Sequence, residues 1–405
     1  MELTIPELSI VSFIGESSSV KLDFIKKYFH KSEVITIDEL EVQGSTRLEK
    51  GELVGIELTQ LDEESHIEIV RLGKKYHCMP VAIVFNPEVL LEQLNTKRKN
   101  KKEDKNKNEN KRVGKKRSAL PNIETYLLQK GYKKVYVLND VDATQNAKVQ
   151  RTKLINNKKD IHGPFDIIGD IHGCYDELCE LLEKLDYIVD KSTGTAYSPE
   201  SRIVAFVGDL VDRGPKIVEV LKLVMSMVKE GRAYCVRGNH DGKLERKLRG
   251  SNVQIIHGLE KTLEELKGET EIFKQELKDF LEGLPSHYVF DEGKLVVAHA
   301  GLKEKLQGRE SPIIRDLAMF GETTGKVDEF GLPIRLNWSE HYKGSALVVY
   351  GHTPHLQAKI INNTINVDTG CVYGGKLTAY RYPEGEIVEV EAKEVYYESV
   401  RLLSN

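Results

Sequence analysis

The sequence predicts an α/β protein with two domains, and three observations support this fold class. The chain has 405 residues, which is longer than one ordinary hydrophobic core requires. Short apolar runs alternate with charged, helix-like segments along the chain. Near residue 160 the pattern changes, and from there each apolar run ends on a polar residue. We therefore expect one domain over residues 1–155 and a second over residues 160–405.

Three apolar runs indicate the strands of the first domain: LSIVSFI, MPVAIVF and KKVYVL. Charged segments such as KLDFIKKYFH separate them and are predicted as helices. Residues 97–117 (KRKNKKEDKNKNENKRVGKKR) form a basic insert with almost no apolar residue. We expect this insert to be disordered when free. Its two interpretations are an electrostatic contact for a polyanion and a solvated loop.

The stretch FIGESSSVKLDF, residues 13–24, partly matches a phosphate-binding loop. The pattern G-x-x-x-x-G-K-S/T brings backbone amides, a lysine and a hydroxyl to phosphate and Mg²⁺. Gly15 and Lys21 fit it. Val20 places a branched side chain where the backbone approaches phosphate, and Leu22 cannot bind Mg²⁺. The stretch is therefore predicted to be the relic of a nucleotide site.

The second domain contains six apolar runs that end on metal-competent residues: FDIIGD, RIVAFVGD, AYCVRGN, KLVVAHA, ALVVYGH and NTINVDTG. Buried strands whose carboxyl ends meet deliver such side chains into one crevice. The candidate metal ligands at these ends are Asp170, His172, Asp209, Asn239, His299, His352 and Asp368. Between the third and fourth runs, apolar residues at helical spacing, Ile272 among them, predict two helices with core-facing stripes.

Oxygen and imidazole ligands without thiolates favour two divalent ions, Mn²⁺ first, with Ni²⁺ or Fe as alternatives and Zn²⁺ less favoured. A carboxylate between two clusters bridges such a pair, and this role suits Asp209. Asp170 and His172 would complete the shell of one ion. Asn239, His299 and His352 would complete the other. Asp368 is interpreted as a ligand or the partner of a ligand, in preference to a turn residue.

Two such ions suit in-line hydrolysis of a phosphoryl group without a covalent intermediate. Arg213 offers a bidentate fork for phosphate oxygens, and Arg237 a second one. His240 is predicted to protonate the leaving oxygen, with Asp241 holding it charged and oriented.

Composition excludes several classes of protein. The net charge of −4 argues against nucleic-acid binding by bulk charge. The five cysteines form no C-x-x-C pair, which fits a reducing compartment, so a cytoplasmic protein is predicted. The N-terminus lacks the pattern of a signal peptide, and no apolar stretch is long enough to span a membrane. The oligomeric state is not predictable from this sequence.

The ordered set GDIHGCYDEL, GDLVDRGP, VRGNHD, VVAHAG, YGHTP and NVDTGCVYGGKLTAYRYPEGE resembles the calcineurin-like metallophosphoesterases. The closest resemblance is to the phosphatase domain of bacterial polynucleotide kinase-phosphatase, over residues 160–405. It implies stacked sheets flanked by helices, the αββα sandwich of that superfamily. It also implies hydrolysis of phosphomonoesters and 2′,3′-cyclic phosphates with Mn²⁺ or Ni²⁺, which prepares RNA 3′ ends for sealing.

The first domain is similar to the P-loop kinase domain of the same family through LTIPELS, KYHCMPVAIVFN and HGPFDIIGD. The resemblance implies a degenerate kinase in which Lys21 and Asp38 remain, with scaffolding as the expected role and non-catalytic binding of a nucleotide or RNA end as an alternative. No K-x-D-G ligase motif occurs in the chain, so a separate RNA ligase is the expected partner.

RNA 3′ ends or nucleotides are thus the predicted substrates. Three alternatives stay open. Two are enzymes that share the GDIHG and GNH motifs: a dinucleoside tetraphosphate hydrolase and a serine/threonine protein phosphatase. The third, of another class, is an RNA-binding scaffold with residual phosphatase activity.

Overall fold

The computed structural model describes residues 1–60, 62–88, 90–92 and 122–399. The basic insert predicted at 97–117 lies outside these residues. The chain divides into two compact units. Unit 1 comprises Met1–Leu154 with Arg309–Ser311, and unit 2 comprises Ile155–Gly308 with Pro312–Asn405.

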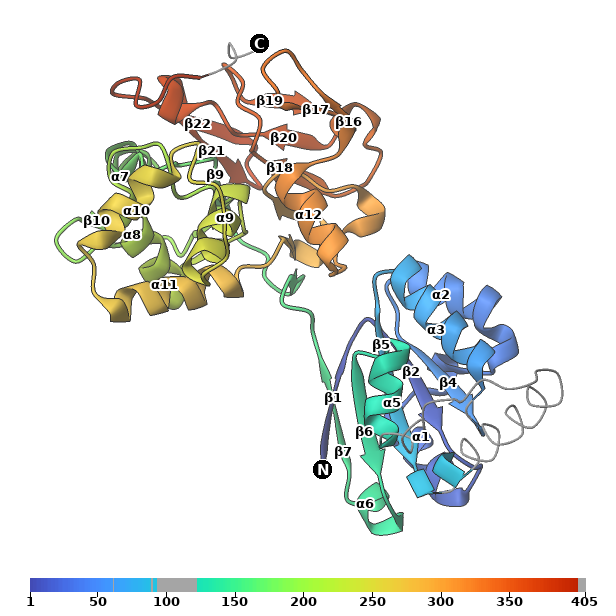
Figure 1. The fold of residues 1–405 in the computed structure, drawn as a ribbon. Coiled ribbons are helices and arrows are strands. Elements are labelled where there is room, and N and C mark those ends of the chain that lie inside the picture. Colours follow the sequence, from blue (N-terminus) through green and yellow to red (C-terminus); the bar gives the residue numbers. More distant parts are fainter. Residues whose placement is uncertain (61, 89, 93–121, 400–405) are drawn as a thin grey trace, which may run out of the picture. The chain divides into compact units, whose positions relative to one another are not determined.

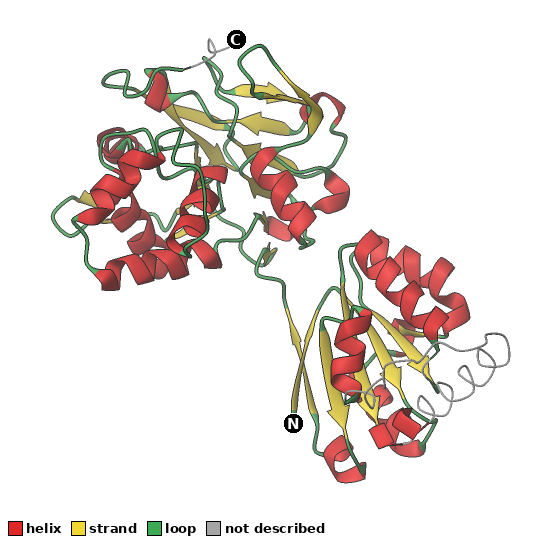
Figure 2. Cartoon of the chain, in the orientation of Figure 1, coloured by secondary structure: helices red, strands yellow, loops and turns green. Residues whose placement is uncertain are grey.

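Unit 1 contains a parallel five-stranded sheet in the order β3-β4-β2-β5-β6. Side chains of β2 alternate between two hydrophobic clusters, one on each face, and helices cover both faces (Figure 2). The strands are β2 (Ser9–Ile14), β3 (Val34–Ile35), β4 (Val54–Leu58), β5 (Met79–Phe85) and β6 (Lys134–Leu138). The helices are α1 (Ser19–Tyr28), α2 (Ser45–Glu49), α3 (Glu63–Lys75), α5 (Ile123–Lys130) and α6 (Val141–Gln145). A separate parallel pair joins β1 (Glu2–Pro6) to β7 (Lys148–Thr152).

Unit 2 contains two sheets whose inner faces share one hydrophobic cluster (Figure 1). The first sheet has the order β13-β12-β9-β21-β22. Its strands are β9 (Phe165–Ile168), β12 (Ile203–Phe206), β13 (Ala233–Cys235), β21 (Lys376–Tyr382) and β22 (Glu386–Glu391). The second has the order β19-β20-β18-β15-β14-β8. Its strands are β8 (Asn157–Lys158), β14 (His287–Phe290), β15 (Leu295–Ala298), β18 (Leu347–Tyr350), β19 (Lys359–Ile361) and β20 (Thr364–Asn366).

Helices cover the outer faces of these sheets, so unit 2 is a layered sandwich. Those on the first sheet are α7 (Tyr175–Lys184), α8 (Ile217–Lys229), α10 (Leu259–Lys267) and α11 (Glu271–Gly283). The remaining helices are α9 (Asn239–Leu248) and α12 (Pro312–Phe320). Two small hairpins complete the unit: β10 (Ile188–Asp190) with β11 (Thr195–Tyr197), and β16 (Thr323–Val327) with β17 (Pro333–Arg335).

The sequence pattern therefore predicts an α/β fold correctly in both units. The two helices expected after β13 and α9 are α10 and α11, and most of their leucines are buried. Ile272 is an exception, because it lies in the first turn of α11 and is 75% exposed. Among the described residues, no helix is both long and apolar enough to cross a membrane.

Candidate active site

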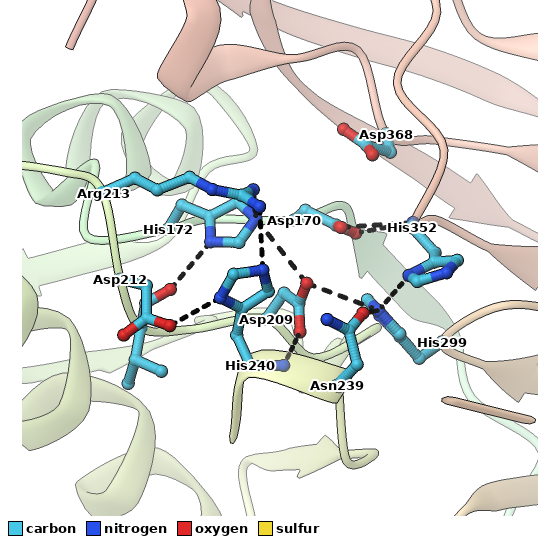
Figure 3. Close-up of polar contacts among 12 residues, drawn as sticks. Asp170, His172, Asp209, Asp212, Arg213, Asn239, His240, His299, His352 and Asp368 are labelled. Atoms are coloured by element: carbon cyan, nitrogen blue, oxygen red, sulfur yellow. Dashed lines mark hydrogen bonds and ion pairs between the residues drawn. The ribbon is translucent and has the colours of Figure 1, made fainter. Parts of the chain in front are cut away.

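Five parallel strands of unit 2 end at one cavity of about 260 Å³, and a sixth, β15, brings His299 within 3.4 Å of Asp209, which lines it. Strands β9, β12 and β13 come from the first sheet, and β15, β18 and β20 from the second. Within one to four residues of the strand ends stand Asp170, Asp209, Asn239, His299, His352 and Asp368 (Figure 3). His172 follows Asp170 and also lines the cavity. The predicted metal ligands thus lie together.

The loops that carry these ligands have unusual backbone conformations. His172, Asp209 and His352 have φ values of 45°, 50° and 75°, in the left-handed region that costs energy for residues other than glycine. Two glycines allow close approaches beside them. A Cβ at Gly214 would lie 1.8 Å from the carbonyl oxygen of His172, and one at Gly351 would lie 2.0 Å from Asp170 Oδ1. Strain of this kind clusters at functional sites.

Asp209 is the centre of the arrangement. Its Oδ2 atom lies 3.6 Å from Nε2 of His172 and 3.4 Å from Nε2 of His299. Two groups of three potential ligand atoms, each within 4.8 Å, share this carboxylate. One group adds His172 and His240, and the other adds His299 and His352. This is the position expected for a carboxylate that bridges two ions.

Hydrogen bonds orient the imidazoles. Nδ1 of His172 donates to the carbonyl of Val211 at 2.7 Å, and Nδ1 of His299 donates to that of Val207 at 3.0 Å. Each ring therefore presents the lone pair of Nε2, the usual arrangement in a metal-binding histidine. Nε2 of His352 is buried and has no hydrogen-bond partner among the residues that the structure describes.

The electrostatics of the cavity also fit divalent cations. Burial raises the pKa of Asp209 and of Asp368 to about 7. Burial raises the pKa of Asp170 as well, and the neighbouring carboxylates of Asp368 and Asp209 add to this effect. Burial lowers the pKa of His299 to about 4, which keeps its ring neutral. Converging carboxylates and neutral imidazoles form a donor set that suits Mn²⁺, Fe²⁺, Ni²⁺ or Zn²⁺.

His240 is held by Asp212, not by Asp241 as the sequence analysis predicts. Nδ1 of His240 lies 2.5 Å from Oδ2 of Asp212, and both side chains are buried. Burial lowers the pKa of His240, whereas a carboxylate at this distance favours its protonated form. Thr262 donates to the other carboxylate oxygen of Asp212. Asp212 is the second aspartate of GDLVDRG, three residues after Asp209.

Asp241 instead organises the backbone around Asp209. Its carboxylate accepts hydrogen bonds from the amides of Asp209, Leu210 and Gly238 at 2.8–3.0 Å. It is fully buried, so these amides depend on it for a partner. The structure therefore replaces the predicted contact with His240 by a bond to the loop that carries the bridging carboxylate.

The two predicted phosphate-binding arginines lie in different environments. Arg213 lines the cavity, and its guanidinium lies 2.8 Å from Nε2 of both His172 and His240. The rings of Tyr373 and Tyr397 flank it, with centroids at 5.3 and 5.7 Å, a contact that the sequence did not indicate. Arg237 is buried and donates to the carbonyls of Leu281 and Glu282 at the end of α11. The prediction that Arg237 binds substrate is therefore not supported by its position.

The partial phosphate-binding loop lies in unit 1, between β2 and α1. Lys21 is fully buried there, and its Nζ donates to the carbonyls of Gly15 at 2.7 Å and Leu58 at 3.1 Å. Glu57 forms an ion pair with it at 3.3 Å. Burial is the main cause that lowers the pKa of Lys21. Its ammonium is thus committed to contacts within the protein.

The geometry agrees with comparisons to known proteins. Residues 163–356, which contain all the cavity ligands except Asp368, match the calcineurin-like phosphoesterases. The chain belongs to the calcineurin-like phosphoesterase family. As a calcineurin-like phosphoesterase it is a metal-dependent hydrolase, and divalent ions are the expected cofactors of its cavity.

Curated relatives of this calcineurin-like phosphoesterase match it over more than half of its length. The asymmetrical bis(5′-nucleosyl)-tetraphosphatase PrpE of Geobacillus sp. (strain WCH70) is 46% identical over 235 residues, 57% of this chain and 95% of the relative. The protein of the same name from Bacillus subtilis (strain 168) is 43% identical over 239 residues, which cover 58% of this chain and 97% of the relative. A solved structure described as a putative diadenosine tetraphosphatase is 26% identical, with a TM-score of 0.44, and covers 58% of this chain and 96% of its own.

Proposed function

We propose that the chain hydrolyses dinucleoside tetraphosphates off centre, releasing a nucleoside monophosphate and a nucleoside triphosphate. The observation that carries the proposal is a pair of ligand clusters that share Asp209 in a cavity also lined by Arg213 and His240. Relatives named for this activity match at 43–46% identity over nearly their whole length. The sequence leaves this activity open as an alternative, and the relatives favour it over RNA end healing.

We assign Asp170, His172 and Asp209 to one ion, with Asn239, His299 and His352 joining Asp209 around the other. Asp368 lines the same cavity and raises the pKa of Asp170, which supports assigning it to the first group. Two divalent ions held there, Mn²⁺ first and Ni²⁺ or Fe as alternatives, would supply Lewis-acid activation of the attacking water and of the phosphoryl group.

The residues of the chain supply the remaining chemistry. Arg213 presents two guanidinium nitrogens to the cavity and binds the oxygens of the phosphoryl group under attack. Nε2 of His240 accepts from Nη2 of Arg213 at 2.8 Å in this structure, and we assign it the proton for the leaving oxygen once the guanidinium turns to the phosphoryl oxygens. Asp212 accepts from Nδ1 at 2.5 Å, which orients the ring and favours its charged form against the burial that lowers its pKa. The leaving group is then the triphosphate part of the substrate.

Hydrolysis of 2′,3′-cyclic and 3′-terminal phosphates on RNA is the second candidate. The observation that favours it is the motif set over residues 160–405, which resembles the phosphatase of polynucleotide kinase-phosphatase. Both reactions use the same centre, so a substrate panel separates them. For unit 1 we propose a scaffolding role without kinase activity, because Lys21 is engaged by Gly15, Leu58 and Glu57.

The test is kcat/KM of the Mn²⁺-loaded chain on diadenosine tetraphosphate, a 2′,3′-cyclic nucleotide, 3′-phosphorylated RNA and a phosphopeptide. We expect the tetraphosphate to be preferred and to yield AMP and ATP. Preference for the RNA substrates would replace the proposal by end healing, and preference for the phosphopeptide by protein phosphatase activity. Asp209→Asn should abolish turnover of every substrate, which shows that the measured activity belongs to this centre.

A further inference from the structure

A second cavity, of about 200 Å³, adjoins the active-site cavity. Arg335 and His352 line both, so the two spaces meet at these residues. The second cavity extends between β17, the loop after β18, and β19, which lie in the same part of unit 2 in Figure 1. Arg335, Trp338 and Lys359, which line it, have no role in the mechanism above.

Arg335 is placed to act on ligands in both cavities. It is the last residue of β17, and its Nη1 donates to Oγ1 of Thr353 at 3.0 Å. Thr353 follows His352, so this bond places the guanidinium beside the metal ligands. The charge of Arg335 acts on His352. Burial is the main cause of the lowered pKa of His352, and the positive charge of Arg335 lowers this pKa further. The residue is exposed, which leaves it accessible to a ligand.

The walls beyond Arg335 have the chemistry of a nucleotide site. Lys359 on β19 and His355 bring nitrogen groups to the cavity. The carboxylate of Glu322 also lines it, but forms an ion pair with Lys303 at 2.5 Å. Trp338 supplies an aromatic ring, held by Tyr350 at 5.1 Å and Tyr342 at 5.6 Å between ring centroids.

We propose that this second cavity binds the outgoing nucleoside triphosphate, with Arg335 and Lys359 on its phosphates and the ring of Trp338 against its nucleoside. The proposal rests on the proposed function, because only an off-centre cut leaves a triphosphate on one side of the metal centre. A phosphate chain extending from that centre meets Arg335 first, and charge-assisted hydrogen bonds to guanidinium are the strong contacts that phosphate makes. Aromatic rings bind nucleobases by stacking.

Trp338 also provides the measurement, since it is the single tryptophan of the chain. We would titrate the full-length, Mn²⁺-loaded protein with ATP and with AMP and follow tryptophan fluorescence. ATP should change the emission saturably. AMP, whose one phosphate does not reach past Arg335, should change it much less. Arg335→Ala and Lys359→Gln should each weaken ATP binding about tenfold or more, the loss of one charge-assisted contact.

Lys326→Ala is the matched control, because it removes one positive charge from the same hairpin, on β16, without lining either cavity. It should leave ATP affinity unchanged. Equal affinities of wild type and Arg335→Ala, or an equal response to AMP and ATP, would overturn the proposal, as would a loss in Lys326→Ala as large as that in Arg335→Ala. Because binding is measured apart from turnover, an Arg335-dependent response without tetraphosphate hydrolysis would reject the proposed function and keep the site.

Discussion

At the scale of single residues, the pair formed by His240 and Asp212 explains how a buried imidazole could serve as an acid. Burial alone disfavours the charged ring. Asp212 at 2.5 Å opposes that effect, and Thr262 fixes the carboxylate so that it faces the ring. The pair therefore holds the proton on Nδ1 and leaves Nε2 facing Arg213 in the cavity.

Asp212→Asn tests this role. We expect kcat on a nucleotide substrate to fall about 100-fold, the lower range for loss of general acid–base catalysis. Turnover of p-nitrophenyl phosphate should fall much less, because its leaving oxygen hardly needs a proton. His240→Asn should show the same dependence on the leaving group, and the double variant should be no worse than either single one. An equal loss on both substrates would assign Asp212 a structural role.

The cluster of candidate metal ligands was predictable from sequence, whereas the partner of His240 was not. Each candidate lies within four residues after a buried strand, so local pattern is enough to find it. The choice between Asp212 and Asp241 depends on a turn in which Asp212 and Arg213 have φ values of 72° and 70°, and no sequence signal specifies that turn. The contacts of Arg237 were not predictable for a similar reason. Its guanidinium donates to carbonyls of α11 that lie 44 and 45 residues further along the chain.

A second residue-scale prediction concerns His66 in unit 1, which is buried on α3 with Nδ1 at 3.2 Å from Oη of Tyr132. Burial lowers its pKa to about 4. In the unfolded chain the pKa of a histidine is about 6.5, so the unfolded state binds the proton more readily. The contribution of neutral His66 to the stability of unit 1 is therefore fully present above about pH 6.5 and is lost as pH falls toward 4. The shift corresponds to about 3 kcal/mol.

His66→Gln should therefore flatten the dependence of unit 1 stability on pH between about 6.5 and 4. Urea unfolding of wild type and variant at a series of pH values measures it. Above that range the two curves should run parallel, which provides the internal control. A wild-type slope that survives the substitution would show that other groups carry the dependence.

At the scale of elements, strands and helices with a buried stripe were predictable, and the β16–β17 hairpin was not. Every residue of these two strands is exposed, so no alternation of apolar and polar residues marks them. Arg335 depends on this hairpin for its position and was missed with it. The antiparallel strands β21 and β22 complete the first sheet after the last candidate ligand.

The loop from Gly15 to the start of α1 has two interpretations, a relic whose lysine is structural and a loop that binds a nucleotide. They predict different effects of replacing Lys21. Lys21→Met removes the side-chain donor to the carbonyls of Gly15 and Leu58. The Leu58 carbonyl keeps its bond from the Gly15 amide, whereas the Gly15 carbonyl loses the ammonium and Glu57 loses its ion pair. We expect unit 1 to lose about 2 kcal/mol of unfolding free energy, with no change in phosphoester hydrolysis. Denaturant unfolding and the substrate panel measure the two effects. A catalytic or ATP-binding lysine would instead show loss of nucleotide binding with little loss of stability.

At the scale of the whole molecule, the chemistry and the partial phosphate-binding loop belong to different units. All the proposed metal ligands lie in unit 2, whose ligand loops are strained and crowded with carboxylates. Unit 1 has its own sheet and its own hydrophobic clusters. Divalent ions should therefore stabilise one unit and not the other.

Scanning calorimetry of the full chain tests this separation. We expect two transitions, of which only one moves to higher temperature with Mn²⁺, since a ligand at 100 times its Kd adds about 2.7 kcal/mol to the folded state that binds it. Asp209→Asn should remove most of that shift, because it removes the carboxylate that the two candidate ligand groups share. Lys21→Met should lower the other transition and keep the Mn²⁺ response intact. If Mn²⁺ moves both transitions together in wild type, the units unfold as one, and the stability of unit 1 is coupled to the metal centre of unit 2.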